Sequence, residues 1–486
     1  MPQNISQRIL TVAGSKAGAI LVTVILTPIL VRMLGSTRYG NYAAVVSMLA
    51  LIMIFVDGGM FVGLRKFIAE EEDSQAWRSD IFSLYLHIAV LFAVIGSIFT
   101  VSIGWLGFAS EWLGPAFRSY FIFMALLIPL RQLFALLRGA LMGIGYETLS
   151  EPLRIISQIL FAGFAIALVY FGGGVEGVLA GRAISIAAVI LIGAIYVAKK
   201  IRVRSIISFS YDVPYSRVLS FNVFSVLLAF LTQSLLHVDI IMLQLLVGGS
   251  ETGYYKAALV VAEFLWFVPQ SIQVVFVQSS SKLWAENQID RITAISARST
   301  RYTLLMVLLF SIGLIALAKP FFTTYYGMEF HRSIEPFLYL LPGVMGFALA
   351  RQIYAIGQGE GSIRILIWAT GASAVINLGL NILLIPRYEM IGAATATSIG
   401  YGSMFLFHVI AARRIGFNPL SDLRIGRILI TAGITAVPIY FLGHTITSNL
   451  VALLVVPPIG LVLYMGVAIQ LGAISASEIR EAISAS

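Results

Sequence analysis

Three arginines lie inside long apolar segments, where a charged side chain is costly to place. Arg131 and Arg138 are seven residues apart, so a helix carries them on one face, and Arg351 lies in a later segment. A charge at membrane depth costs at least about 2.5–3.5 kcal/mol, and such groups usually face a bundle interior or a wet cavity. Guanidinium groups match phosphate oxygens in pairs and stay charged when partly dried. The three residues predict a positively charged cavity that accepts an anionic group.

Two further cations lie within apolar segments, and we expect both to line the same cavity. They are Lys16 and Arg182. An alternative applies to Arg138 and Arg351, whose long side chains can reach the inner membrane interface from their depth. The predicted substrate-binding residues are therefore Arg131, Arg138, Arg182, Arg351 and Lys16.

Acidic residues in apolar segments are candidates for binding a coupling ion, H⁺ or Na⁺. These residues are Asp57, Asp239 and Glu263. For Asp57 the favoured alternative is a structural pair with an arginine. His237 and Asp239 are two residues apart, so they point to different helix faces, and no metal site is predicted. The chain has no cysteine, which excludes thiolate and iron–sulfur chemistry. No catalytic residue and no cofactor is predicted.

The composition of the chain indicates the type of secondary structure in which these residues lie. The 486-residue chain is 59% hydrophobic and 11% charged, whereas soluble proteins carry roughly a quarter charged residues. It contains about fourteen apolar segments, each near the ~20 residues that a membrane helix requires. We therefore predict an all-α polytopic membrane protein, because the ~10-residue alternating segments of a β-barrel are missing from the sequence. The net charge of +9 is attributed to loops beside the membrane, and no nucleic-acid partner is expected.

An internal repeat organises the segments. The stretch from Pro129 to Arg138 recurs from Pro342 to Arg351, 213 positions later, and the same offset pairs Gly40 with Gly253. Six segments fill each copy, so the copies should be parallel six-helix bundles, related by a pseudo-two-fold along the membrane normal and enclosing a central cavity. The predicted parts are an N-terminal lobe (1–198), a basic linker (199–217), a C-terminal lobe (218–414) and two extra helices with a short tail (415–486).

The distribution of basic residues predicts the orientation. Lys and Arg concentrate in alternate loops, and such loops normally lie in the cytoplasm. The clusters lie at 65–78, 199–217, 282–301 and 413–427. We therefore expect a multi-pass protein of the cell membrane with both termini in the cytoplasm.

Two neighbouring motifs carry a resemblance to a known family. Residues 34–43 read LGSTRYGNYA and residues 56–70 read VDGGMFVGLRKFIAE. This resembles the start of the Wzx-type polysaccharide flippases, which have a Leu-Gly, Tyr-Gly junction after the first helix and a basic-aromatic end to the second. The fourteen segments in two halves with an extra pair are similar to the multidrug/oligosaccharidyl-lipid/polysaccharide (MOP) superfamily.

The resemblance implies a non-enzymatic transporter that works by alternating access. It would move a polyprenyl-(di)phosphate-linked oligosaccharide from the cytoplasmic to the outer leaflet, with the cavity arginines holding the phosphate end. Its expected partners are membrane lipids and glycan-assembly enzymes.

Three other functions stay open. A cation-coupled multidrug or metabolite exporter would depend on Asp57 or Glu263 rather than on the arginines. A lipid II-type flippase also has fourteen spans. A membrane-embedded glycan polymerase or glycosyltransferase is disfavoured because the outer loops are short.

Overall fold

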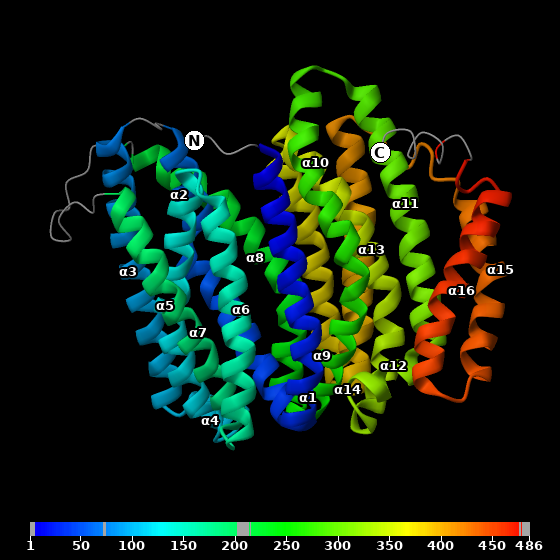
Figure 1. Cartoon of the computed structure of the whole chain (residues 1–486), viewed down its shortest axis with the longest axis horizontal. Helices are drawn as coiled ribbons and strands as arrows, with labels where there is room; N and C mark the ends of the chain where they lie inside the picture. The colour runs from blue at the N-terminus through cyan, green and yellow to red at the C-terminus, as the bar shows by residue number, and fades with distance from the viewer. Residues whose placement is uncertain (1–4, 71–73, 202–212, 214, 476–477, 479–486) are drawn as a thin grey trace. The chain divides into compact units, whose positions relative to one another are not determined.

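The computed structural model describes residues 5–70, 74–201, 213, 215–475 and 478, and every regular element in these ranges is a helix (Figure 1). The first helices are α1 (Ile5–Asp57), α2 (Met60–Glu70), α3 (Gln75–Trp105), α4 (Phe108–Leu113), α5 (Phe117–Gly143), α6 (Glu147–Tyr170), α7 (Gly174–Lys200) and α8 (Tyr215–Leu246). The others are α9 (Gly249–Glu263), η1 (Phe264–Trp266), α10 (Phe267–Ala285), α11 (Ile289–Ala316), α12 (Ala318–Tyr325), η2 (Met328–Ser333), α13 (Ile334–Glu360), α14 (Ile363–Ile415), α15 (Ile425–Thr445) and α16 (Asn449–Gln470).

The helices form two compact units, Met1–Gly253 and Tyr254–Ser486. Helix α8 belongs to the first unit, where it packs on α1, and α9 continues from the first unit into the second. The lobe boundaries expected from the repeat stay a prediction.

Two helices are twice as long as a membrane crossing requires, and each contains a break. Helix α1 is broken at Gly35, whose φ of 70° lies in the left-handed region that glycine adopts without strain. Helix α14 is broken at Glu389, with φ 49°, three residues after Pro386. Both breaks fall between segments that the sequence predicts as separate spans, so each 53-residue helix comprises two predicted crossings.

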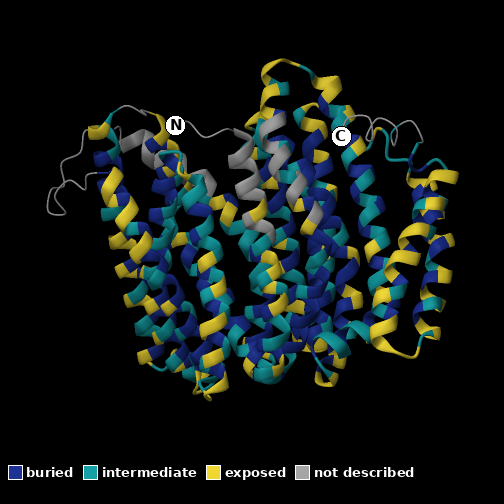
Figure 2. Ribbon diagram, viewed as in Figure 1, coloured by how far each residue is buried: buried dark blue, intermediate teal, exposed yellow. Residues whose placement is uncertain are grey.

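The helix surfaces confirm a multi-pass membrane protein. Eleven helices within the described residues are long and apolar enough to cross a membrane; a total of fourteen stays a prediction. Large apolar side chains are exposed along α3, including Leu91, Ile95 and Ile98, and along α16, including Leu454 and Val462 (Figure 2). Contiguous exposed apolar faces of this kind are rare on soluble proteins and suit a lipid environment.

The first unit is built around α5, which packs against α2, α3 and α7. The second arm of α1 meets the beginning of α9 at backbone distance. A Cβ added to Gly40 would lie 1.9 Å from the Gly249 carbonyl oxygen, and one added to Gly253 would lie 2.0 Å from the Ser36 carbonyl oxygen. The two glycines that the repeat pairs, Gly40 and Gly253, thus lie at one helix crossing where no larger residue fits.

The second unit is built around α13, which packs against α10, α11 and α14. Helices α15 and α16 pair with each other and pack on α11. Pro129 lies inside α5 and Pro342 inside α13, so the repeated stretch forms the central helix of each unit.

Candidate functional site

In the first unit, three predicted residues come together. Arg131 on α5 and Arg182 on α7 are both half-buried, and Arg131 interacts electrostatically with Arg182, with Asp57 and with the hydroxyl-bearing side chain of Tyr42. No hydrogen bond or ion pair joins Arg131 to another described residue. Two arginines and one carboxylate leave this group with an excess of positive charge inside a membrane-embedded bundle.

A glycine turn positions Asp57. Helix α1 ends at Asp57, and Gly58 and Gly59 follow with φ of 51° and 76°, which lets the chain turn before α2 begins at Met60. The Asp57 Oδ1 atom is buried and accepts no hydrogen bond from the described residues. Backbone N–H groups of Gly59 and Phe61 do bond the Asp57 carboxylate, so Oδ1 is the atom that is a candidate to bind a proton or a cation.

Arg182 is held by an amide and an aromatic ring. Its Nη1 donates to Gln158 Oε1 at 3.4 Å, and its guanidinium lies 5.0 Å from the centroid of the Phe161 ring. Both partners lie on α6, which packs along α7. They orient the guanidinium without cancelling its charge.

Arg138 has a different environment. Its Nη2 donates to Glu151 Oε1 at 2.8 Å, and Arg154 contacts the other carboxylate oxygen at 3.1 Å. The guanidinium also lies near the rings of Phe61 and Phe134. Glu151 is only 6% exposed, so this pair ties α5 to α6, and two arginines share the one carboxylate.

In the second unit, Arg351 on α13 is enclosed by aromatic rings. Its guanidinium lies 4.8 Å from the Phe347 ring centroid and 5.3 Å from the Trp266 ring centroid, and these two rings stack at 4.4 Å. Its Nη1 donates to Gln273 Oε1 at 3.0 Å, while its buried Nε has no acceptor among the described residues. Glu263, at the end of α9, interacts with it electrostatically.

The remaining predicted residues lie apart from these two groups. Asp239 is fully buried on α8, where its Oδ1 accepts from the backbone N–H of Ile240, and the nearby His237 Nδ1 lies 3.1 Å from Ser47 Oγ. Lys16 lies on α1, but its side chain is outside the described residues. No group of three or more His, Cys, Asp or Glu that could hold a metal ion occurs in the described ranges.

The sequence analysis missed the partners that orient the arginines. These partners are Gln158, Phe161, Trp266, Gln273 and Phe347. One signal was present, because a phenylalanine stands four residues before the arginine in both copies of the repeat, as Phe134 and Phe347. Residues four apart are neighbours on a helix, so this spacing predicts a contact between the ring and the guanidinium.

Solved structures with similar folds define the class of protein. The lipid II flippase MurJ, in an inward closed conformation, matches with a TM-score of 0.76 at 15% identity, covering 95% of this chain and 98% of that chain. An inward-facing multidrug resistance MATE family transporter of the MOP superfamily matches with a TM-score of 0.66 at 15% identity, covering 83% and 95%. The protein therefore has the fold of MOP-superfamily transporters, as the predicted resemblance implies.

Sequence comparison gives the family within that class. A family model described as polysaccharide biosynthesis protein matches residues 7–281, more than half of the chain, and the chain belongs to this family. A curated relative, the probable low-salt glycan biosynthesis flippase Agl15 of Haloferax volcanii, is 22% identical over 384 residues, which are 78% of this chain and 77% of that protein.

Proposed function

We propose that this protein is a flippase for a lipid-linked oligosaccharide, moving it from the cytoplasmic to the outer leaflet without making or breaking a bond. The observation that carries the proposal is the excess positive charge at Arg131 and Arg182, deep in a bundle of the polysaccharide biosynthesis family. The named activity of the relative Agl15 and the fold shared with MurJ support the same substrate class.

The guanidinium groups have distinct roles in this proposal. Arg131 and Arg182 in the first unit, and Arg351 in the second unit, bind the phosphate oxygens of the substrate. Arg138 and Lys16 complete the predicted set and contribute to the local positive potential. Whether all five line one cavity stays a prediction.

The membrane potential supplies a driving force for this step. A phosphate end of charge −2 that leaves a negative interior gains about 4.6 kcal/mol at 100 mV, at ~2.3 kcal/mol per charge. In the proposed orientation both termini are cytoplasmic, the protein lies in the cell membrane, and glycan-assembly enzymes supply the substrate on the inner face.

The proposal is tested by leaflet-resolved measurement of the glycan lipid in cells. Arg131→Ala and Arg351→Ala should each cause the glycan lipid to accumulate on the inner leaflet, with transport at least tenfold lower and protein levels unchanged. The matched control is Arg118→Ala, which removes an exposed arginine from α5, the helix that carries Arg131. Normal transport by both cavity variants would refute the assigned site.

A second candidate, a cation-coupled exporter, is favoured by the buried Asp57 Oδ1 that accepts no hydrogen bond from a described residue. Coupling to H⁺ or Na⁺ through Asp57, Asp239 or Glu263 is also compatible with flipping. The two functions differ in one measurement: an exporter loses dye efflux on Asp57→Asn and keeps it on Arg131→Ala.

A further inference from the structure

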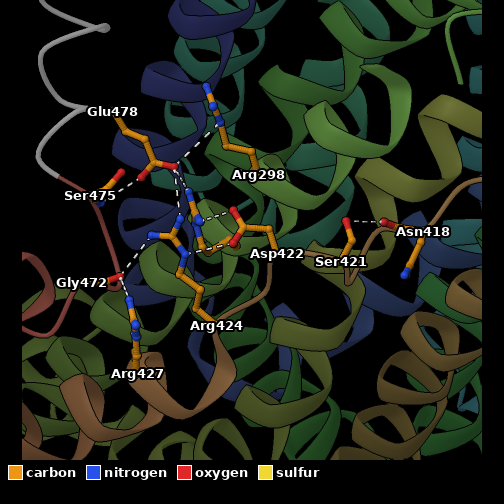
Figure 3. A network of polar contacts seen from close by, with 10 residues as sticks. Arg298, Asn418, Ser421, Asp422, Arg424, Arg427, Gly472, Ser475 and Glu478 are labelled. Carbon is orange, nitrogen blue, oxygen red and sulfur yellow. Dashed lines mark hydrogen bonds and ion pairs between the residues drawn. The ribbon is translucent and has the colours of Figure 1, made fainter. Parts of the chain in front are cut away.

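A second cluster of arginines lies in the second unit, near the ends of its helices. Arg298 and Arg301 lie about three turns into α11, and Arg424 and Arg427 flank the start of α15. The segment that follows α16 lies against them and brings in Glu478 (Figure 3). We call these five residues and Asp422 the tail cluster. Its parts come from three stretches that are far apart in the sequence.

One carboxylate is the focus of the tail cluster. Glu478 Oε1 bonds to Nη2 of Arg301 and lies 4.0 Å from Arg298 Nε and 3.9 Å from Arg424 Nη2. Glu478 Oε2 accepts from the backbone N–H of Ser475 at 2.9 Å. Figure 3 shows Arg298 and Arg424 directed at this acidic group, which is only 9% exposed.

The cluster carries more positive than negative charge. Its four arginines face two carboxylates, Glu478 and Asp422, and Asp422 is shared between Arg301 and Arg424. Arg424 and Arg427 each donate an Nη1 to the same Gly472 carbonyl oxygen at 3.1 Å. Two cations that converge on one neutral acceptor repel each other, and an added anion relieves that repulsion.

The buried side chain of Arg301 indicates that the site is preorganised. Its side chain is fully buried, and its Nε has no acceptor among the described residues even though both terminal nitrogens are bonded. The other arginines are partly exposed, Arg298 at 54% and Arg424 at 25% of the side chain. The cluster therefore combines a fixed cation at its base with accessible cations at its rim.

The chemistry of the cluster selects a phosphate group. Several guanidinium groups around one small acceptor match the oxygens of a phosphate, which form more charge-assisted hydrogen bonds than a carboxylate does. Arg424 and Arg427 also lie at the start of α15, a helix long and apolar enough to cross a membrane.

We propose that Arg298, Arg301, Arg424 and Arg427 form a phosphate-binding site at the membrane surface, and that the Glu478 carboxylate is its displaceable internal occupant. An arriving phosphate takes the position of the Glu478 carboxylate and frees Glu478 from the arginines. Asp422 stays bonded to Arg301 and Arg424 and keeps α11 joined to the start of α15. The site is separate from the arginines of the proposed transport function and does not depend on them.

Protonation does not free Glu478 from the arginines under physiological conditions. Burial raises the pKa of Glu478, but the backbone N–H and side chain of Ser475 and the Arg301 guanidinium lower it more, to about 2. The carboxylate therefore stays charged until the pH falls far below the cellular range. An anionic competitor is needed to displace it.

Binding to the purified full-length protein tests the site. The probes are short-chain phosphatidic acid, phosphatidylcholine of equal chain length, and inorganic pyrophosphate, each followed by calorimetry in detergent. Glu478→Gln weakens the internal occupant and should tighten phosphatidic acid binding about tenfold, whereas Arg427→Gln should weaken it several-fold. Arg291→Gln, which removes an exposed charge from α11 outside the cluster, is the matched control and should change nothing.

The outcomes distinguish a lipid headgroup from a free phosphate as the ligand. Binding of phosphatidic acid alone identifies a lipid headgroup, and equal binding of pyrophosphate identifies a free phosphate; both support the site if Glu478→Gln strengthens them. The proposal is overturned if Glu478→Gln binds no tighter than the unmodified protein, or if Arg291→Gln loses as much as Arg427→Gln.

A second measurement avoids any folding defect of the Glu478 variant. The chain has no cysteine, so Ser475→Cys provides a single position for a fluorescent label beside Glu478 and keeps the backbone N–H that bonds Glu478. Phosphatidic acid should lower the fluorescence anisotropy of this label as Glu478 is freed. An unchanged anisotropy at saturating lipid would mean that Glu478 is a fixed clamp.

Discussion

Arg138 and Arg351 occupy the same place in the repeat but have different surroundings. Arg138 donates to the buried carboxylate of Glu151 at 2.8 Å, whereas Arg351 donates to the neutral amide of Gln273 at 3.0 Å and lies against two aromatic rings. Both have a phenylalanine four residues earlier, at 5.8 Å and 4.8 Å from the guanidinium.

The difference shows that a repeated residue need not have a repeated role. A buried carboxylate occupies the guanidinium of Arg138 and makes this residue a link between α5 and α6. A neutral amide and aromatic rings orient Arg351 and leave its charge available to an anion. We therefore propose that Arg138 acts mainly in stability and Arg351 mainly in substrate binding.

The largest expected effect is on stability. Arg138→Ala removes the 2.8 Å partner of the buried Glu151 carboxylate, and removing one member of a buried pair costs about 3 kcal/mol. We expect the melting temperature of the purified protein to fall by several degrees, measured by fluorescence-detected thermal unfolding. Arg351→Ala, which strands no hydrogen-bonded carboxylate, should change it much less.

The double variant Arg138→Ala/Glu151→Ala is the control for this assignment. Removing both partners also removes the stranded charge, so most of the lost stability should return. A double variant as unstable as the single one would show that Arg138 acts through packing against Phe61 and Phe134 instead.

Much of the fold could be predicted from the sequence, because membrane helices are defined by length and apolarity alone. The breaks at Gly35 and Glu389 fall where the predicted spans separate, and the repeated stretches form α5 and α13. The break between Glu263 and α10, through the 3₁₀ turn η1, also has a sequence signal, because Pro269 has no N–H to bond the carbonyl of Leu265 within the turn.

The candidate site was predicted less completely. The sequence identifies costly charges, and Arg131, Arg182 and Asp57 do lie together. It does not identify the side chains that hydrogen-bond to Arg138 and Arg351. These partners, Glu151 and Gln273, lie on other helices, and only tertiary packing brings them to the arginines. For the same reason the ion pairs of Arg301 with Asp422 and Glu478 could not be foreseen, since 121 and 177 residues separate the partners.

The second largest expected effect comes from a substitution that gives Arg351 a carboxylate partner like that of Arg138. Gln273→Glu places a carboxylate at the Arg351 guanidinium and reproduces the pairing of Arg138 with almost no change in shape. A charged hydrogen bond is worth about 1.5–3 kcal/mol, so a substrate phosphate that must displace it should bind at least roughly tenfold more weakly. Transport measured against substrate concentration should show a raised half-saturation point with unchanged thermal stability.

Gln273→Ala serves as the comparison, since it removes the same hydrogen bond without adding a charge. It should weaken transport only a few-fold. If both variants lower transport equally, a carboxylate partner at Arg351 does not compete with the substrate. The different partners of Arg138 and Arg351 would then not explain different roles in transport.

The smallest expected effect separates the charge of Arg351 from its shape. Arg351→Lys keeps a cation but loses the planar contact with Trp266 and Phe347, and each cation–π contact is worth about 0.5–2 kcal/mol. We expect transport to fall about fivefold, less than in Arg351→Ala. Arg138→Lys should keep full transport, because an ammonium still pairs with Glu151. Equal losses in the two lysine variants would mean that planar guanidinium geometry matters at both positions, and that Arg138 also contacts the substrate.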